Sequence, residues 1–98
     1  SLPSAFHLAC PAVGIEQKPY RQENAGGAMP ARHARMARKV GIVTAQNGPA
    51  ATLLVAPLAE ALKASVPVLA LVQEVTRDSV DRNAFQELDH LAMFAPVA

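Results

Sequence analysis

Three short stretches of this 98-residue chain hold residue types that could carry chemistry. Glu23 lies between a possible strand and a helix, with small residues on one side of it. Residues 47–49, Asn-Gly-Pro, form a glycine turn before a helix-forming run, and residues 85–87 are Phe-Gln-Glu. A carboxylate can hold or transfer a proton, and a glycine lets a ligand approach the backbone closely. The three stretches are therefore candidates for a small-molecule site.

Each candidate also has a purely structural explanation. Glu23 in the first turn of a helix would complement the helix dipole. The Asn-Gly-Pro turn lacks the lysine of a phosphate-binding loop and the three glycines of a dinucleotide fingerprint, so it can be a simple turn. Phe85 can belong to the core at the start of a helix. The residues alone leave both explanations open.

Other reactive residue types do not form a recognisable site. The histidines, His7, His33 and His90, are too scattered to match the spacing of metal ligands. Cys10 has no basic neighbour to activate its thiol, which favours a small buried apolar residue. Asp89 and His90 are adjacent, but no nucleophile completes a triad with them. The sequence therefore predicts no metal site and no nucleophilic triad.

The elements around the glycine turn predict a parallel sheet. Residues 41–45 are apolar and partly β-branched, which is typical of a short buried strand. A helix-forming run, residues 50–64, follows the turn, and residues 66–72 form a second apolar run. Strand, helix and strand in this order indicate a βαβ unit. Because ligands bind at the carboxyl ends of parallel strands, residues 46–52 are where a small molecule is expected.

The amino-terminal part is less regular. A weak helical stripe of Leu2, Phe6 and residues 8–9 opens the chain and must break near Pro11, with Gly14 closing it. Residues 18–22 could form a short strand, in which Pro19 favours an edge position or an irregular entry. Residues 24–38 predict a helix rich in alanine and arginine.

Prolines interrupt both long predicted helices. Pro30 lies well inside residues 24–38, where it costs about 3 kcal/mol, so this helix either begins near Pro30 or is kinked. Pro57 predicts a bend or two short helices within residues 50–64. One face of that run should pack on the sheet and carries leucines at helical spacing: Leu54, Leu58 and Leu62. Beyond it we expect a polar loop over residues 74–83 and a short helix or turn over residues 84–93.

Composition limits the classes of function. Apolar residues make up 51% and aromatic residues 4% of the chain, which is enough for one small core built from Ala, Val and Leu. A net charge of +1 gives no case for nucleic acid, and no run reaches the roughly 18 apolar residues of a membrane span. A single cysteine indicates a reducing compartment, so we expect the cytoplasm. Both ends look cut, which suggests a fragment.

Taken in order, the motifs resemble those of thiamine diphosphate-dependent enzymes. Residues 21–23 are similar to an Arg-His-Glu motif, residues 47–53 to a Ser-Gly-Pro-Gly-Ala-Thr-Asn turn, and residues 84–87 match Ala-Phe-Gln-Glu. The resemblance is greatest to the pyrimidine-binding domain of the acetolactate synthase-like group. It implies an α/β fold with a parallel sheet flanked by helices, flavodoxin-like and three-layered. Residues 1–98 would be an incomplete amino-terminal domain of this type.

The resemblance also implies roles for individual residues. Glu23 would hydrogen-bond N1′ of the aminopyrimidine of the cofactor and take part in catalysis. Gly48 and Pro49 would line the pyrimidine pocket, and Phe85 and Gln86 would approach the substrate, with Gln86 also catalytic. The chain departs from the family pattern at two positions of the turn, because Ala50 replaces a glycine and Leu53 replaces an asparagine.

The same resemblance implies partners outside this chain. In the family, a separate domain holds the diphosphate and Mg²⁺ through a Gly-Asp-Gly motif that is absent here, and some members carry FAD. The active site lies between subunits, so a homodimer or homotetramer acting on a 2-oxo acid such as pyruvate is implied. Alternatives are another decarboxylase or an acetyltransferase of the superfamily, or a non-catalytic α/β binding module. We expect the 98 residues alone to bind the cofactor weakly and to be inactive.

Overall fold

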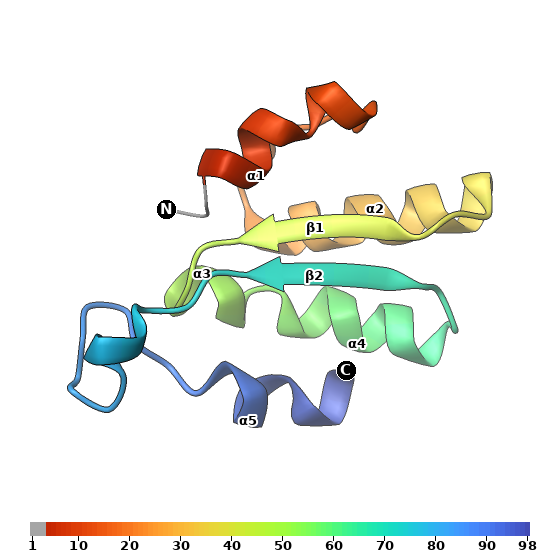
Figure 1. Cartoon of the computed structure of the whole chain (residues 1–98). Helices are drawn as coiled ribbons and strands as arrows, with labels where there is room; N and C mark the ends of the chain where they lie inside the picture. The colour runs from red at the N-terminus through yellow and green to blue at the C-terminus, as the bar shows by residue number, and fades with distance from the viewer. Residues whose placement is uncertain (1–3) are drawn as a thin grey trace.

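The computed structural model describes residues 4–98 as helices around a small parallel sheet (Figure 1). The elements in chain order are α1 (Ser4–Ala9), η1 (Pro11–Val13), α2 (Glu23–Ala37), β1 (Gly41–Ala45), α3 (Pro49–Thr52), α4 (Val55–Lys63), β2 (Val68–Val72), η2 (Arg77–Ser79), α5 (His90–Phe94) and η3 (Ala95–Val97). The elements labelled η are short 3₁₀ helices.

The two strands pair in parallel, as the βαβ pattern predicts. Their register aligns Gly41 with Val68 and Ala45 with Val72, and α3 and α4 form the crossover between them. β1 occupies the predicted residues, whereas β2 begins two residues later than predicted, at Val68. The predicted α/β fold class is confirmed.

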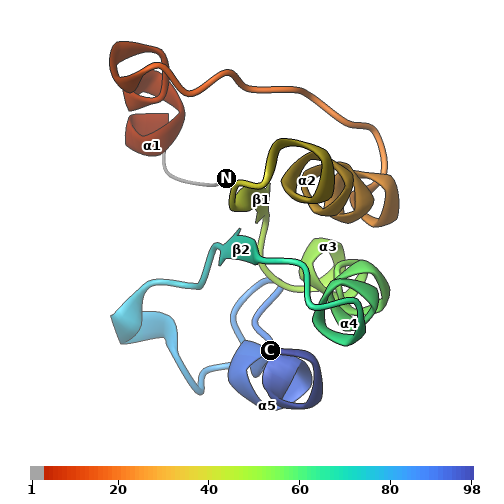
Figure 2. The same cartoon turned by 90° about the vertical axis from the view of Figure 1, so that its right-hand side faces the viewer.

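The helices cover one face of the sheet. Figure 2 shows α2, α3 and α4 on the same side of the two strands. The core there consists of Val43 and Ala45 from β1 and of Leu54 and Leu58 from the crossover. Ile42 and Leu69 are paired across the two strands and remain exposed. The domain is therefore an incomplete version of a flavodoxin-like three-layer fold.

Helix α2 accommodates Pro30 in its interior. It begins at Glu23, so the alternative of a late start near Pro30 is wrong. Pro30 is buried against β1, where a Cβ on Gly41 would lie 2.3 Å from the Pro30 carbonyl oxygen. The close approach of α2 and β1 explains why a glycine stands at position 41.

The crossover consists of two short helices, as Pro57 suggested. The break falls at residues 53–54, and Pro57 is the third residue of α4, where its missing N–H would have no helical partner anyway. Leu54 and Leu58 are buried as predicted, but Leu62 is 47% exposed and the prediction for it is wrong. Ala61 is buried instead, because a residue seven positions after Leu54 returns closer to its direction than one eight positions after.

The amino-terminal segment matches the predictions in part. Helix α1 is followed by η1, and Gly14 closes that turn with φ of 76°, while Leu2 lies outside the described residues. Cys10 is buried, as expected for a small apolar side chain. The strand predicted for residues 18–22 is wrong, because this segment pairs with neither β1 nor β2. Pro19, which has no N–H to donate, helps to explain the difference.

The carboxyl-terminal third is mostly loop, as its polar composition predicted. Turns occupy residues 80–83 and 85–86, and the short helix α5 starts at His90. No helix within residues 4–98 is both long enough and apolar enough to cross a membrane.

Candidate functional site

Three of the segments singled out by the sequence lie at one end of the sheet. The carboxyl ends of β1 and β2 point to the same end of the molecule, and the start of α2, the start of α3 and the loop before α5 are found there (Figure 1). The Tyr20 hydroxyl, three residues before Glu23, donates a hydrogen bond to the carbonyl of Thr44 in β1. This contact holds the start of α2 beside the carboxyl end of β1.

The turn at residues 47–49 has a conformation that requires glycine. Gly48 has φ of 70° and ψ of −127°, which side chains of L-residues strongly disfavour, and Pro49 is the first residue of α3. A Cβ on Gly48 would lie 2.5 Å from the carbonyl oxygen of Gln86. The absence of a side chain at Gly48 therefore lets two distant segments touch.

A side-chain hydrogen bond strengthens this junction. Asn47 is buried, and its Nδ2 donates to the carbonyl oxygen of Gln86 at 3.1 Å. Gln86 itself adopts φ of 61°, a left-handed conformation. The structure thus brings the glycine turn and the Phe-Gln-Glu segment together, although 39 residues separate them.

The histidine that the sequence left unassigned lies at the centre of this junction. His90 is only 8% exposed, and its Nε2 accepts a hydrogen bond from the N–H of Gly48 at 2.9 Å. Its other ring nitrogen, Nδ1, is 2.8 Å from Oε2 of Glu74, which follows β2 by two residues. The N–H of Val75 and then the hydrogen bond with His90 hold the pKa of Glu74 below its usual value. No local motif signals this arrangement, because it joins three segments.

Glu87 organises the loop that carries Gln86. Its carboxylate accepts hydrogen bonds from the N–H of Asp81 at 2.5 Å and of Ala84 at 3.0 Å. These bonds close residues 81–87 into a loop (the closed loop), in which Asp81 and Asn83 adopt left-handed conformations. Phe85 in this loop is 85% exposed, so the alternative that it belongs to the core is wrong. The turn at residues 85–86 directs this ring outward instead of starting a helix.

Glu23 is the first residue of α2 and is half-buried. Burial of the phenol, and then the charge of the nearby Glu23 carboxylate, raise the pKa of Tyr20. Among residues 4–98, no hydrogen bond or ion pair engages the Glu23 side chain. A carboxylate with a free hydrogen-bonding capacity therefore stands near the carboxyl end of β1.

A second unpaired acceptor lies at the same edge of the sheet. Gln73 follows β2 directly, and its N–H donates to the carbonyl of Ala45 at 3.1 Å. Its side-chain Oε1 is buried and has no hydrogen-bond partner. Glu23 and Gln73 thus both carry acceptor atoms without a hydrogen-bond partner among the described residues. The described residues contain no group of three or more His, Cys, Asp or Glu side chains that could hold a metal ion.

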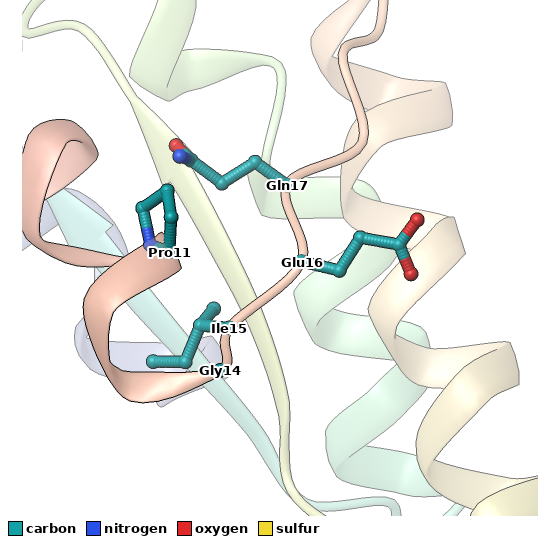
Figure 3. Close-up of a pocket in the computed structure, with 5 residues that line it drawn as sticks. All are labelled: Pro11, Gly14, Ile15, Glu16 and Gln17. Carbon is teal, nitrogen blue, oxygen red and sulfur yellow. The ribbon is translucent and has the colours of Figure 1, made fainter.

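The hollow shown in Figure 3 lies elsewhere. Five residues line it, all from the exposed segment around η1: Pro11, Gly14, Ile15, Glu16 and Gln17. Glu16 there is paired with the exposed Lys18. None of the predicted site residues contributes to this hollow, so it is separate from the candidate site.

The fold and the site define a class of protein: an α/β domain with a glycine turn and a carboxylate at the carboxyl end of a parallel sheet. The family described as "Thiamine pyrophosphate enzyme, N-terminal TPP binding domain" matches residues 4–93. The chain belongs to this family, and thiamine pyrophosphate is another name for thiamine diphosphate. The recognition made from the sequence motifs is therefore confirmed.

Individual relatives are acetolactate synthases. The chain is 40% identical to "Acetolactate synthase" of Mycobacterium leprae over 77 residues, which are 79% of this chain and 12% of that protein. It is 36% identical to "Acetolactate synthase isozyme 2 large subunit" of Escherichia coli over 80 residues, 82% of this chain and 15% of that protein. The chain thus spans less than a sixth of the length of these relatives.

Proposed function

We propose that the chain is part of the pyrimidine-binding domain of a larger thiamine diphosphate-dependent enzyme that acts on 2-oxo acids. The reaction would be a carboligation after decarboxylation, as the name of the acetolactate synthases it resembles suggests. The observation that carries this proposal is the junction of the glycine turn with the Phe-Gln-Glu segment, at the sheet end where Glu23 begins α2.

Each residue has a distinct part in this proposal. When bound, thiamine diphosphate supplies a stabilised carbanion, which is chemistry that side chains cannot provide. Glu23 holds and releases a proton at its carboxylate, which no other described side chain engages. Gly48 presents its backbone, and Pro49 its apolar ring, to the aminopyrimidine. Phe85 and Gln86 reach the substrate from the closed loop.

The setting of Glu23 supports an acid–base role. A half-buried carboxylate without a protein partner is available to a ligand, and a partly desolvated site strengthens each hydrogen bond made there. Tyr20 covers one side of this region, because its ring lies against Gly26 in the first turns of α2. The competing explanation, in which Glu23 only complements the helix dipole, does not require α2 to begin beside the carboxyl end of β1, where Tyr20 holds it.

The larger enzyme would supply what this chain does not contain. We place the groups that hold the diphosphate and Mg²⁺ outside residues 1–98. The larger enzyme could also carry FAD, as some members of the family do. A homodimer or homotetramer would complete the site between subunits, in the cytoplasm.

The variant Glu23→Gln tests the proposal in the natural protein that contains this chain. Glutamine keeps the shape of the side chain but cannot hold and release a proton, so we expect the turnover of pyruvate to fall by roughly 10²- to 10⁴-fold. Glu60→Gln, on the exposed side of α4, is the matched control and should retain activity. Circular dichroism would show that both variants keep the fold. Unchanged turnover in Glu23→Gln would remove the proposed role.

A further inference from the structure

We propose that His90, oriented by Glu74, is a positioning residue that holds the Gly48 turn in the geometry that receives the cofactor. This inference rests on the function proposed above, and it gives a task to a buried histidine that the family motifs do not cover. It also accounts for the contact between the first residue of α5 and the glycine turn.

The hydrogen bonds fix the state of the imidazole. The backbone N–H of Gly48 can only donate, so Nε2 of His90 at 2.9 Å must carry a lone pair. The proton of the neutral ring is then on Nδ1, which donates to Oε2 of Glu74 at 2.8 Å. The carboxylate therefore selects the one tautomer in which His90 can accept from Gly48.

The backbone that His90 holds has a conformation that glycine adopts readily and other residues do not, so its position needs an anchor. Gly48 has a conformation with φ of 70° and ψ of −127°, and its N–H is buried. The preceding residue, Asn47, donates a hydrogen bond to the carbonyl of Gln86. His90 thus anchors one side of the turn to α5, and Asn47 anchors the other to the closed loop. Loss of the His90 acceptor would leave a buried donor unpaired and let the turn move.

The contact depends on the charge of the ring. A protonated His90 would carry N–H groups on both nitrogens, and Nε2 would then face the N–H of Gly48 donor to donor. The charged groups close to the ring are Glu74, in direct contact, and the neighbouring Asp89. The Asp89 carboxylate is already occupied by the N–H of Ala92 at 3.0 Å, where it caps α5. The contact with Gly48 therefore requires the neutral ring.

Replacements at position 90 test this in the natural protein that contains the chain. His90→Leu fills similar space without an acceptor and should raise the half-saturating thiamine diphosphate concentration by roughly 5- to 100-fold. His90→Gln keeps an acceptor near the position of Nε2 and should restore most of the affinity. His33→Gln is the matched control, because this histidine is exposed on α2.

A variant of the partner carboxylate separates positioning from a general loss of fold. Glu74→Leu should weaken cofactor binding less than His90→Leu, because the ring remains but its tautomer is no longer selected. If His90→Leu fails to fold, the comparison of Glu74→Leu with the wild type still decides, because an unchanged cofactor requirement in Glu74→Leu would overturn the inference.

A cofactor-free measurement keeps this inference distinct from the proposed function. Hydrogen exchange of the peptide that includes Gly48 should be slow in the wild type and His90→Gln, and fast in His90→Leu. A wild type that does not respond to thiamine diphosphate would overturn the proposed function, and the exchange data would still decide whether His90 positions the turn. Equal exchange and equal cofactor requirement in His90→Leu and wild type would overturn the inference.

Discussion

The candidate site depends most directly on Gly48. Its backbone has a positive φ, and the absence of a side chain lets Gln86 approach. We expect Gly48→Ala to lower the free energy of unfolding of the chain by about 1–3 kcal/mol through backbone strain alone. The added Cβ would also lie 2.5 Å from the Gln86 carbonyl and force the closed loop away. Urea denaturation measures the loss.

A second glycine provides the control for this prediction. Gly14 also has a positive φ, 76°, but a Cβ there would meet nothing within 4 Å. Gly14→Ala therefore reports the cost of the left-handed backbone without a clash, about 1–2 kcal/mol. Equal losses in the two variants would contradict the close contact between Gly48 and Gln86.

Glu74 should make stability depend on acid. Its pKa is lowered in the folded chain by the N–H of Val75 and by His90, so its contribution is complete above the ordinary value of 4.5 and is lost as the pH falls through the lower folded value. We expect the free energy of unfolding to fall less steeply below about pH 4.5 in Glu74→Gln than in the wild type. Urea titrations at several pH values measure these slopes.

Salt distinguishes this effect from that of an exposed ion pair. Lys18 lowers the pKa of Glu16 in the same direction, but both groups are exposed. In about 1 M salt, the screening length is about 3 Å. There the free energy of unfolding of Glu16→Gln should depend on pH as that of the wild type does. The Glu74 effect should persist there, because a backbone N–H supplies its largest cause. If salt also removed the pH dependence that Glu74 contributes, the assignment of the Glu74 effect to hydrogen bonds would be contradicted.

The residue scale also shows where sequence reasoning stops. Gly48 was predictable, because a glycine between a strand and a proline carries a local signal. His90 was not, because its contacts come from Gly48 and Glu74, which are 42 and 16 residues away. The sequence left Phe85 open between a core residue and a substrate contact, and only its exposure beside the left-handed Gln86 excludes the core.

At the scale of elements, the contact between α2 and α4 depends on a glycine. A Cβ on Gly27 would lie 2.5 Å from Cγ of Pro57 and 3.3 Å from Cδ2 of Leu54. We expect Gly27→Ala to destabilise the chain by about 1–3 kcal/mol through overpacking, although alanine is the better helix former by up to about 1 kcal/mol. Thermal or urea unfolding would measure the net change.

The neighbouring position separates the two contributions. Ala28 is exposed on the same helix, so Ala28→Gly reports helix propensity without the contact, at a cost of about 1 kcal/mol. A Gly27→Ala variant more stable than the wild type would show that α2 and α4 do not approach this closely.

Elements with strong local signals were predictable, and elements that need a partner were not. β1 follows from its own apolar residues, a glycine and the turn after it. The break in the crossover comes three residues before Pro57, because a proline fits the first turn of a helix and does not mark the residue where the previous helix ends. Residues 18–22 have some strand character, but a strand exists only where a neighbour supplies hydrogen bonds, and here β1 pairs with β2.

At the scale of the whole molecule, the sheet is the limiting feature. Two parallel strands have helices on one face, and Ile42 and Leu69 stay exposed. Parallel sheets are normally covered on both faces, so the described residues form a domain with a small core and an uncovered apolar surface. The site at its edge is correspondingly open, with Phe85 exposed beside it.

This openness predicts how the 98-residue chain behaves with the cofactor. The chain spans 12% of the Mycobacterium leprae relative, and residues 4–98 hold no cluster of metal-binding side chains. Two or three hydrogen bonds to an aminopyrimidine would contribute about 1–4 kcal/mol, far from the roughly 8 kcal/mol of micromolar binding. Calorimetric titration with thiamine diphosphate and Mg²⁺ should therefore detect no tight binding, and pyruvate should not be consumed. The natural protein that contains the chain is the positive control. Micromolar binding or turnover by the isolated chain would show that these residues form a complete site by themselves.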